Sequence, residues 1–158
     1  MKNYSFALLF LILIASGCQQ ADQGPCTEPV VSIKAHYEDI TTLKQYIDSS
    51  HIAAKFDERG FYYTIDAPGS GKKPDACANV TVNYSGKLTN GKTFDSASGI
   101  SFYLNQLILG WQEGIPLVGP GGSITLYLPP SLAYGSQDQN DIPGNSILVF
   151  KIDLVKIN

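Results

Sequence analysis

The sequence predicts an α+β fold: a curved antiparallel β-sheet of about five strands wraps around one short α-helix, and a short amphipathic helix precedes it. Two observations lead to this prediction. From residue 60 onward, apolar and polar residues alternate in several short segments, which is the period of half-buried strands. Before residue 60, apolar residues recur at spacings of three and four, which is the period of a helix.

The helix before the sheet is predicted over residues 38–50. Its apolar stripe consists of Tyr37, Ile40, Leu43 and Ile47. A stripe of this width on a short helix indicates packing against a neighbouring element rather than a functional surface.

Five strand-forming segments follow in order. They are "FYYTI" (61–65), "ANVTVNYSGKL" (78–88), "ISFYL" (100–104), "GGSITLYLPP" (121–130) and "NSILVFKIDLVKI" (145–157). The fourth segment stops at two prolines, which cannot continue a β-ladder. Before it, "NQLILGWQEGI" (105–115) predicts the short helix that the sheet surrounds.

A tight hairpin is predicted at Asn90-Gly91, because Asn-Gly is favoured in two-residue hairpin turns. Phe94 and Asp95 follow on the returning strand, so a bulky ring and a carboxylate stand side by side after the turn. The carboxylate either satisfies the turn or contributes to a site.

The chain divides into four predicted parts. They are an export signal at 1–17, a polar tether at 18–35, a short helical extension at 36–59 and the sheet domain at 60–158. With 11 Lys and Arg against 14 Asp and Glu, the chain is mildly acidic, and it shows no basic stripe. Nucleic acid is therefore not expected as a partner.

The first residues, "MKNYSFALLFLILIASGC", have the build of an export signal. Lys2 supplies a positive start, and the apolar run from Phe6 to Ala15 is too short to span a membrane. The run ends in small residues and Cys18, which resembles a bacterial lipoprotein signal, although Ala15 stands where Leu is usual. We expect Cys18 to carry lipid and to anchor the protein in the bacterial cell envelope, facing the periplasm; ordinary secretion is the alternative. By analogy, Gln19 favours the outer membrane.

Cys26 and Cys77 are the remaining cysteines. In an exported protein such a pair can form a disulfide, but the sequence does not show that their α-carbons come within bonding range. Neither cysteine has a histidine at ligand spacing, so no metal site is expected.

Aromatic and large aliphatic residues cluster at the ends of the predicted elements. The set is Tyr84, Phe94, Trp111, Tyr134 and Phe150, with Leu107, Ile108 and Ile142. Such a set is typical of an ordinary core. Two details favour a binding site: Trp111, the only tryptophan, follows a glycine, and Tyr134 stands between a Pro-Pro break and a polar loop.

Four segments resemble the FKBP-type peptidyl-prolyl cis-trans isomerases. They are "VNYSGKLTNGKTFDSAS" (82–98), "LILGWQEGI" (107–115), "GPGGSITLYLPPSLAYG" (119–135) and "IPGNSILVFKIDLVKI" (142–157). The motifs come in the family's order, and the resemblance extends from about residue 60 to the C-terminus. It implies an FKBP-like fold and an enzyme that rotates X–Pro bonds.

The resemblance also implies roles for residues in a proline pocket. Trp111 would form its floor, and Tyr84, Phe94 and Phe150 would form its walls. Where many members have a further aromatic wall, this chain has Ile100, which implies a wider apolar pocket.

The remaining implied roles belong to the rim. Leu107 and Ile108 would line one side, with the Ile108 N–H facing a substrate carbonyl, and Ile142 would close the other side. Tyr134 would offer its hydroxyl to the carbonyl before the proline. Asp95 would accept hydrogen bonds from ring hydroxyls and orient the rings.

Rotation about an X–Pro bond breaks amide resonance, at a barrier of roughly 18–20 kcal/mol. No bond is cleaved, so the reaction requires no nucleophile, metal or cofactor. An apolar pocket favours the twisted amide, because water solvates the charge-separated planar form better.

We expect proline-containing polypeptides as clients, macrolides such as rapamycin as inhibitors, and a monomer. The alternative function is a binding module, a chaperone or adaptor that holds proline segments without turnover. A hydrolase pairing Asp95 with Glu113 is disfavoured, because the helix carrying Glu113 matches the isomerase motif.

Overall fold

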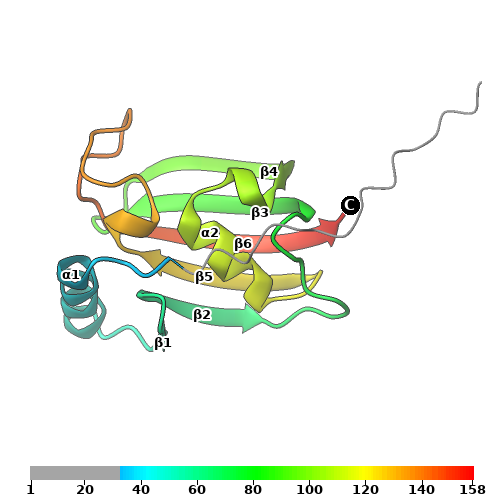
Figure 1. Ribbon diagram of the computed structural model, residues 1–158, viewed down its shortest axis with the longest axis horizontal. Coiled ribbons are helices and arrows are strands. Elements are labelled where there is room, and N and C mark those ends of the chain that lie inside the picture. The colour runs from blue at the N-terminus through cyan, green and yellow to red at the C-terminus, as the bar shows by residue number, and fades with distance from the viewer. Residues whose placement is uncertain (1–32) are drawn as a thin grey trace, which may run out of the picture.

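A six-stranded antiparallel sheet curls around helix α2, with helix α1 at one end (Figure 1). The computed structural model describes residues 33–158. The predicted signal, Cys18, Cys26 and most of the tether lie outside these residues. The strand order is β1 (Lys55–Asp57), β2 (Phe61–Ala67), β5 (Gly122–Leu128), β6 (Leu148–Ile157), β3 (Asn79–Leu88) and β4 (Thr93–Tyr103). The predicted fold class is confirmed, and the short edge strand β1 was not predicted.

The central strands show the predicted alternation. In β5, Ile124, Leu126 and Leu128 are fully buried, while the residues between them are partly exposed. Phe150 and Ile152 of β6 pair with β5 on the same inner face. This face forms the core and receives α2.

Helix α1 (Tyr37–Ser49) begins and ends one residue before the predicted 38–50. It buries Leu43 and Ile47. Two hydrogen bonds tie its start to the short 3₁₀ turn η3 (Pro130–Leu132): the Ser131 N–H donates to Asp39 Oδ2 at 3.0 Å, and the His36 N–H donates to Ser131 Oγ at 3.1 Å. The extension is therefore docked on the sheet domain.

The predicted helix at 105–115 is interrupted. A 3₁₀ turn, η1 (Leu104–Gln106), precedes α2 (Leu109–Gly114), and a second, η2 (Ile115–Leu117), follows it. Leu107 and Ile108 lie between η1 and α2 with ψ of 171° and 148°. Gln112 Nε2 donates to the Leu107 carbonyl at 2.7 Å, and the Ile108 carbonyl accepts the N–H groups of Trp111 and Gln112 at 2.9 and 3.1 Å. The break aims both side chains at the space beside α2.

The predicted strand at 100–104 and the segment returning from the hairpin form one strand, β4, that contains two bulges. Asp95 pairs with Gly86 but Thr93 pairs with Lys87, so Phe94 is an extra residue. A second extra residue lies between Ala97 and Ile100. Bulges of this kind re-aim side chains and often lie beside functional sites.

The hairpin turn differs from the predicted two-residue form. The Gly91 N–H donates to the Leu88 carbonyl at 2.9 Å, and the Leu88 N–H donates to the Lys92 carbonyl at 2.9 Å. Residues 89–91 therefore form a three-residue loop. Gly91, with φ of 85°, takes the left-handed conformation that closes such a loop.

Two glycines let α2 lie directly on β5. A Cβ added to Gly110 would come 2.4 Å from a Leu128 methyl, and one added to Gly114 would come 2.5 Å from a Leu126 methyl. No real side chain tolerates contacts this short without movement, so the backbone of α2 sits closer to the sheet than any other residue would allow.

We expect Gly114→Ala to lower the free energy of unfolding by about 1–3 kcal/mol, the usual cost of overpacking a core. Chemical denaturation would measure it. Leu126→Val withdraws the methyl groups that the new Cβ meets. Gly114→Ala with Leu126→Val should therefore lose less than the sum of the two single changes, and strict additivity would contradict the close contact.

Candidate active site

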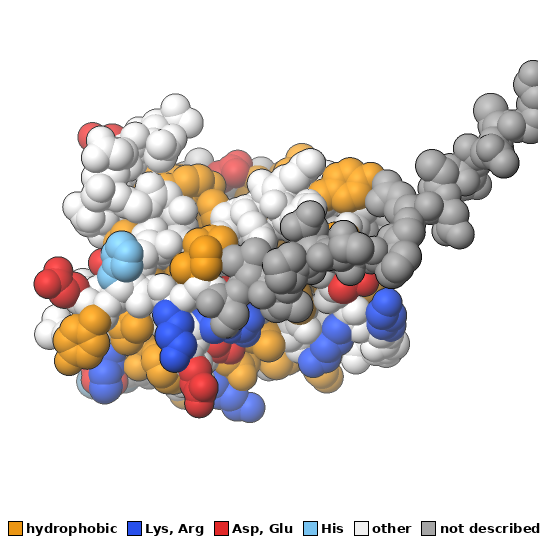
Figure 2. Space-filling view, in the orientation of Figure 1, with side chains coloured by type: hydrophobic (Ala, Val, Ile, Leu, Met, Phe, Trp, Pro, Cys, Tyr) orange, Lys and Arg blue, Asp and Glu red, His pale blue; other side chains and the backbone are white. Residues whose placement is uncertain are grey.

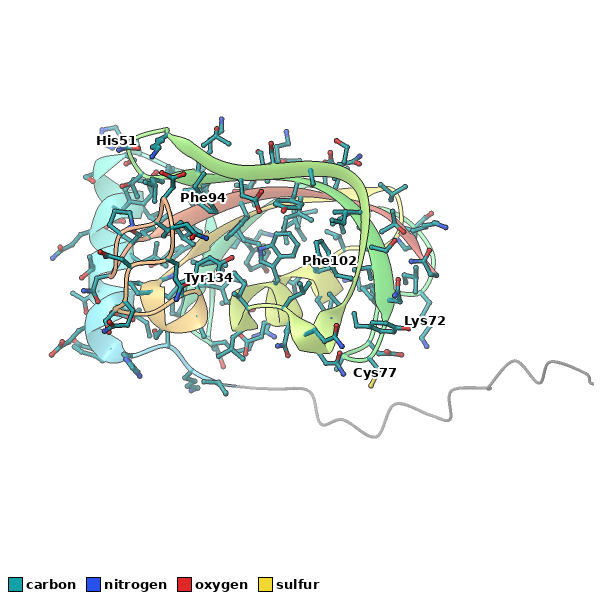
Figure 3. All side chains as sticks on the ribbon, turned by 90° about the horizontal axis from the view of Figure 1, so that it is seen from above. His51, Lys72, Cys77, Phe94, Phe102 and Tyr134 are labelled. Carbon is teal, nitrogen blue, oxygen red and sulfur yellow. The ribbon has the colours of Figure 1, made fainter. Side chains whose placement is uncertain are left out.

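A cavity of about 180 Å³ lies between α2 and the inner face of the sheet. Its lining residues are Tyr84, Asp95, Phe102, Leu107, Ile108, Trp111, Tyr134 and Phe150. Figure 3 shows Phe102 and Tyr134 in the space between the curled sheet and α2. The lining is aromatic and aliphatic, and Asp95 is its only charged side chain.

The cavity is built around the indole of Trp111, which is 4% exposed. Three rings meet it nearly at right angles: Tyr84 at a centroid distance of 5.0 Å, Phe150 at 5.2 Å and Phe102 at 6.3 Å. Edge-to-face contacts at these distances are the favoured geometry of aromatic pairs. Each ring is therefore held by its neighbours.

The bulge in β4 between Ala97 and Ile100 brings two lining residues of the first cavity, Asp95 and Phe102, to the same face of the strand. Asp95 and Phe102 are seven residues apart, and strict alternation would put them on opposite faces. The extra residue in the bulge shifts the alternation by one position, so both side chains lie on the same face. Gly99, with φ of 68°, forms this bulge, and its N–H donates to Asn83 Oδ1 at 2.8 Å.

Phe94 and Ile142 line a second, adjoining cavity of about 440 Å³. Asp95 and Tyr134 border both cavities, so the two spaces share one wall. The remaining lining residues, Gln139, Asn140 and Asp141, are polar. The second cavity is thus the more polar of the two.

Phe94 nevertheless supports the first cavity. Its ring meets Phe150 edge to face at 5.5 Å and 88°. This contact requires Gly86 on β3, because a Cβ there would come 2.5 Å from Phe94 and 2.8 Å from Phe150. The glycine of "YSGKL" therefore makes room for both rings.

Asp95 is bound to a tyrosine of the pocket. The Tyr84 hydroxyl donates to Asp95 Oδ2 at 2.6 Å. Burial, followed by this hydrogen bond, raises the pKa of Tyr84 to about 12, so the hydroxyl stays protonated. Burial, with a smaller effect from the Asp95 charge, raises the pKa of Tyr134 as well. Both hydroxyls therefore remain donors at neutral pH.

Ile100, the residue expected at the missing aromatic wall, lies outside the lining of both cavities. It pairs with Val82 on the inner face and is 37% exposed. Phe102, two residues further along the same face, lines the first cavity. Sequence reasoning missed Phe102, although its spacing of two from Ile100 in "ISFYL" placed it on that face.

Cys77 is disulfide-bonded. Cys18 and Cys26 lie outside the described residues, so the pairing of Cys77 with Cys26 stays a prediction. Within residues 33–158, no His, Cys, Asp and Glu side chains form a group of three that could hold a metal. No helix in this part of the chain is both long and apolar enough to cross a membrane.

Positive charges are unevenly distributed over one face of the molecule. On the face shown in Figure 2, the visible Lys and Arg side chains lie on the half formed by α1, β1, β2 and the loop after β2. The half formed by β4 and the loop before β6 shows hydrophobic, uncharged and acidic side chains.

Sequence relatives match the sheet domain. A chain from Buchnera aphidicola (subspecies Schizaphis graminum), named FKBP-type peptidyl-prolyl cis-trans isomerase FkpA, is 46% identical over 103 residues, covering 62% of this chain and 41% of that protein. The FkpA of Aeromonas hydrophila is 41% identical over 107 residues, covering 65% of this chain and 40% of that protein. The matched part thus spans about two fifths of these relatives.

Solved structures share the architecture. The crystal structure of FkpA from Escherichia coli superposes with a TM-score of 0.70 at 35% identity, covering 77% of this chain and 60% of that one. A peptidyl-prolyl cis-trans isomerase from Pseudomonas syringae gives 0.68 at 30% identity, covering 79% of this chain and 98% of that one.

The family profile described as FKBP-type peptidyl-prolyl cis-trans isomerase matches residues 70–155. This match takes in β3, β4, β5, α2, most of β6 and every residue that lines the first cavity. The chain belongs to the FKBP-type peptidyl-prolyl cis-trans isomerase family.

Proposed function

We propose that this protein accelerates the cis–trans isomerisation of X–Pro bonds in polypeptides. The observation that supports it best is the first cavity, an apolar cup around Trp111 whose one charged group, Asp95, is engaged by a tyrosine. Family membership supports the same reaction. No covalent step is needed, and the cup offers no free nucleophile in its lining.

The proposed rate acceleration depends on removing water from the substrate amide. A planar amide has a charge-separated oxygen that water stabilises, and rotation removes that separation. Transfer into an apolar cup therefore costs the planar amide more than the twisted one, which lowers the barrier. The edge-to-face contacts of Tyr84 and Phe150 with Trp111 fix the positions of these rings, so the shape of the cup is set by the protein itself.

Each site residue has a proposed role. Trp111 is the floor on which the proline ring rests, and the walls are Tyr84, Phe102 and Phe150, with Phe94 extending the wall by packing against Phe150 from the second cavity. Phe102 supplies the aromatic wall that Ile100 does not, since it contacts both Trp111 and Tyr84.

At the rim, the 42% exposed Tyr134 donates its hydroxyl to the carbonyl before the proline. Leu107 and Ile108 hold one side of the ligand, and Ile142 closes the other through the second cavity. Asp95 fixes the angle of the Tyr84 ring and transfers no proton.

The cellular setting is proposed from the N-terminal sequence and the relatives. Cys18 carries a lipid that anchors the protein in the bacterial cell envelope, facing the periplasm, and Cys26 pairs with Cys77. Clients are proline-containing polypeptides of that compartment, the protein acts as a monomer, and macrolides such as rapamycin compete for the cup.

Phe102→Ala should lower kcat/KM for a proline peptide about tenfold, since Phe102 is partly buried and its loss removes somewhat less than the roughly 1.5–3 kcal/mol of a fully buried aromatic side chain. Tyr103→Ala is the matched control, because Tyr103 is the next aromatic on β4 and is 39% exposed. It should stay within about twofold of wild type. Equal losses in the two variants would contradict the proposed wall.

Tyr84→Phe and Asp95→Asn should each lower kcat/KM, because each weakens the 2.6 Å hydrogen bond that orients the Tyr84 ring. The two effects should not add: kcat/KM of the double variant should equal that of the less active single variant. A double variant whose loss equals the sum would mean that Asp95 acts separately from Tyr84.

The alternative, a module that binds proline segments without turnover, predicts a different result in the same assay. Peptide binding would persist and rapamycin would displace the peptide, while the isomerisation rate would equal that in buffer. Turnover inhibited by rapamycin supports the enzyme.

Anchoring can be tested in a bacterial host. Wild-type protein should fractionate with membranes, and mass spectrometry should find an acylated Cys18 as the mature N-terminus. Cys18→Ser should move the protein to the soluble fraction. A wild-type N-terminus without lipid would favour ordinary secretion.

A further inference from the structure

Glu113 is a buried carboxyl group that the proposed reaction does not use. It lies on α2, two residues after Trp111, and is 1% exposed. Among the described residues, neither of its carboxylate oxygens accepts a hydrogen bond of good geometry, and the backbone N–H of Ile33 is the donor that acts on it. A buried carboxylate without well-formed hydrogen bonds is costly, so this group requires an explanation.

Within residues 33–158 one cation, Arg59, faces this carboxyl, and its guanidinium already binds Asp57. Arg59 Nε lies 4.0 Å from Glu113 Oε2 but 2.7 Å from Asp57 Oδ1, while Arg59 Nη2 donates to Asp57 Oδ2 at 2.9 Å. The Arg59 guanidinium also lies over the Phe61 ring, at 5.2 Å from its centroid. Two carboxylates therefore share one positive charge, and ionised Glu113 leaves the group with a net negative charge.

Burial favours a proton on Glu113. Burial raises the pKa of Glu113 from 4.5 to about 7, and the Asp57 charge adds to this rise. The Arg59 charge and the backbone N–H of Ile33 act against it. Arg59 and Asp57 are the charged groups of the described chain that act on this carboxyl.

Residues 33–35 pass beside this site on its N-terminal side, and Ala35 is buried there. Ile33 approaches Glu113 with its backbone, and the Ala35 N–H donates to the Arg59 carbonyl at 2.8 Å. In Figure 1 the segment before α1 runs from the helix toward α2. The opposite side of α2 is fastened to β5 through Gly110 and Gly114. Movement of residues 33–36 away from α2 would therefore expose Glu113 to water on this side.

We propose that Glu113, Arg59 and Asp57 form a proton-controlled latch beneath residues 33–36. With Glu113 protonated, the segment stays closed and holds α1 on the domain. With Glu113 ionised, the carboxylate gains hydration when the segment lifts, so the latch opens more often. This inference concerns how the extension is docked and does not rest on the proposed isomerase activity.

The direction of the pH dependence of opening follows from the difference in proton binding between the closed and open states. A carboxyl with a higher pKa in the closed state binds protons more tightly there, so closure is favoured at low pH and is weakened as pH rises from about 4.5 to about 7. With those two values for the open and closed states, the opening equilibrium grows about 30-fold between pH 5.5 and pH 8.0. Above the upper value it changes little.

Hydrogen exchange of the full chain would test this. Protection factors, corrected for the pH dependence of intrinsic exchange, are compared at pH 5.5 and 8.0 for α1 and for the central strands β3 and β6. An undocked helix of 13 residues is marginal in water, so opening should expose its amides. The variants are Glu113→Gln, which cannot ionise, and Glu58→Gln, which changes an exposed carboxylate next to Arg59.

In wild type and Glu58→Gln, α1 protection should fall up to about 30-fold from pH 5.5 to 8.0, while β3 and β6 stay unchanged. In Glu113→Gln, α1 protection should not depend on pH. Asp57→Asn, which removes the charge that helps to raise the pKa of Glu113, should move the transition to lower pH.

Three results would overturn the latch: no fall in wild type, an equal fall in Glu113→Gln, or a fall in β3 and β6 together with α1. The last would mean global rather than local opening. If Glu113→Gln proved too unstable to study, the direction of the shift in Asp57→Asn would decide alone.

Discussion

The close contact between α2 and β5 is the constraint on which the rest of the structure depends. Gly110 and Gly114 allow the helix backbone to rest on Leu126 and Leu128, and this depth sets the height of Trp111 above the sheet. At that height the indole meets the edges of Tyr84, Phe102 and Phe150. Side chains in place of the two glycines would push the helix away from β5 and separate Trp111 from these rings, so the cavity would lose its shape.

Two bulges in β4 place side chains of the sheet next to the rings that surround Trp111. One bulge inserts Phe94 against Phe150, and the other brings Asp95 and Phe102 to the same face. The carboxylate and the aromatic side by side after the hairpin thus have separate tasks: Phe94 supports the wall from outside, while Asp95 holds the Tyr84 hydroxyl. An edge strand with bulges is also a poor template for pairing with another chain.

Much of the fold could be predicted, because alternation and helical spacing report burial directly. The strands β2, β3, β5 and β6 and helix α1 follow these periods. The bulges of β4 and the break at Leu107 and Ile108 could not be predicted in this way, since they depend on side-chain hydrogen bonds such as those from Gln112 to Leu107 and from the Gly99 N–H to Asn83. The spacing of two from Ile100 placed Phe102 on the inner face, but its contact with Trp111 depends on how far the helix lies from β4. The burial of Glu113 could not be predicted, because the sequence of α2 does not show what packs over that side of the helix.

The most direct test is to measure binding and turnover on the same peptide. Trp111 is the only tryptophan, so its fluorescence reports occupancy of the cup, and NMR exchange spectroscopy of the peptide reports the cis–trans rate. An apolar cup that favours the twisted amide predicts that the fluorescence change is accompanied by exchange far faster than the uncatalysed tens to hundreds of seconds. A saturating fluorescence change with exchange no faster than in buffer would contradict it.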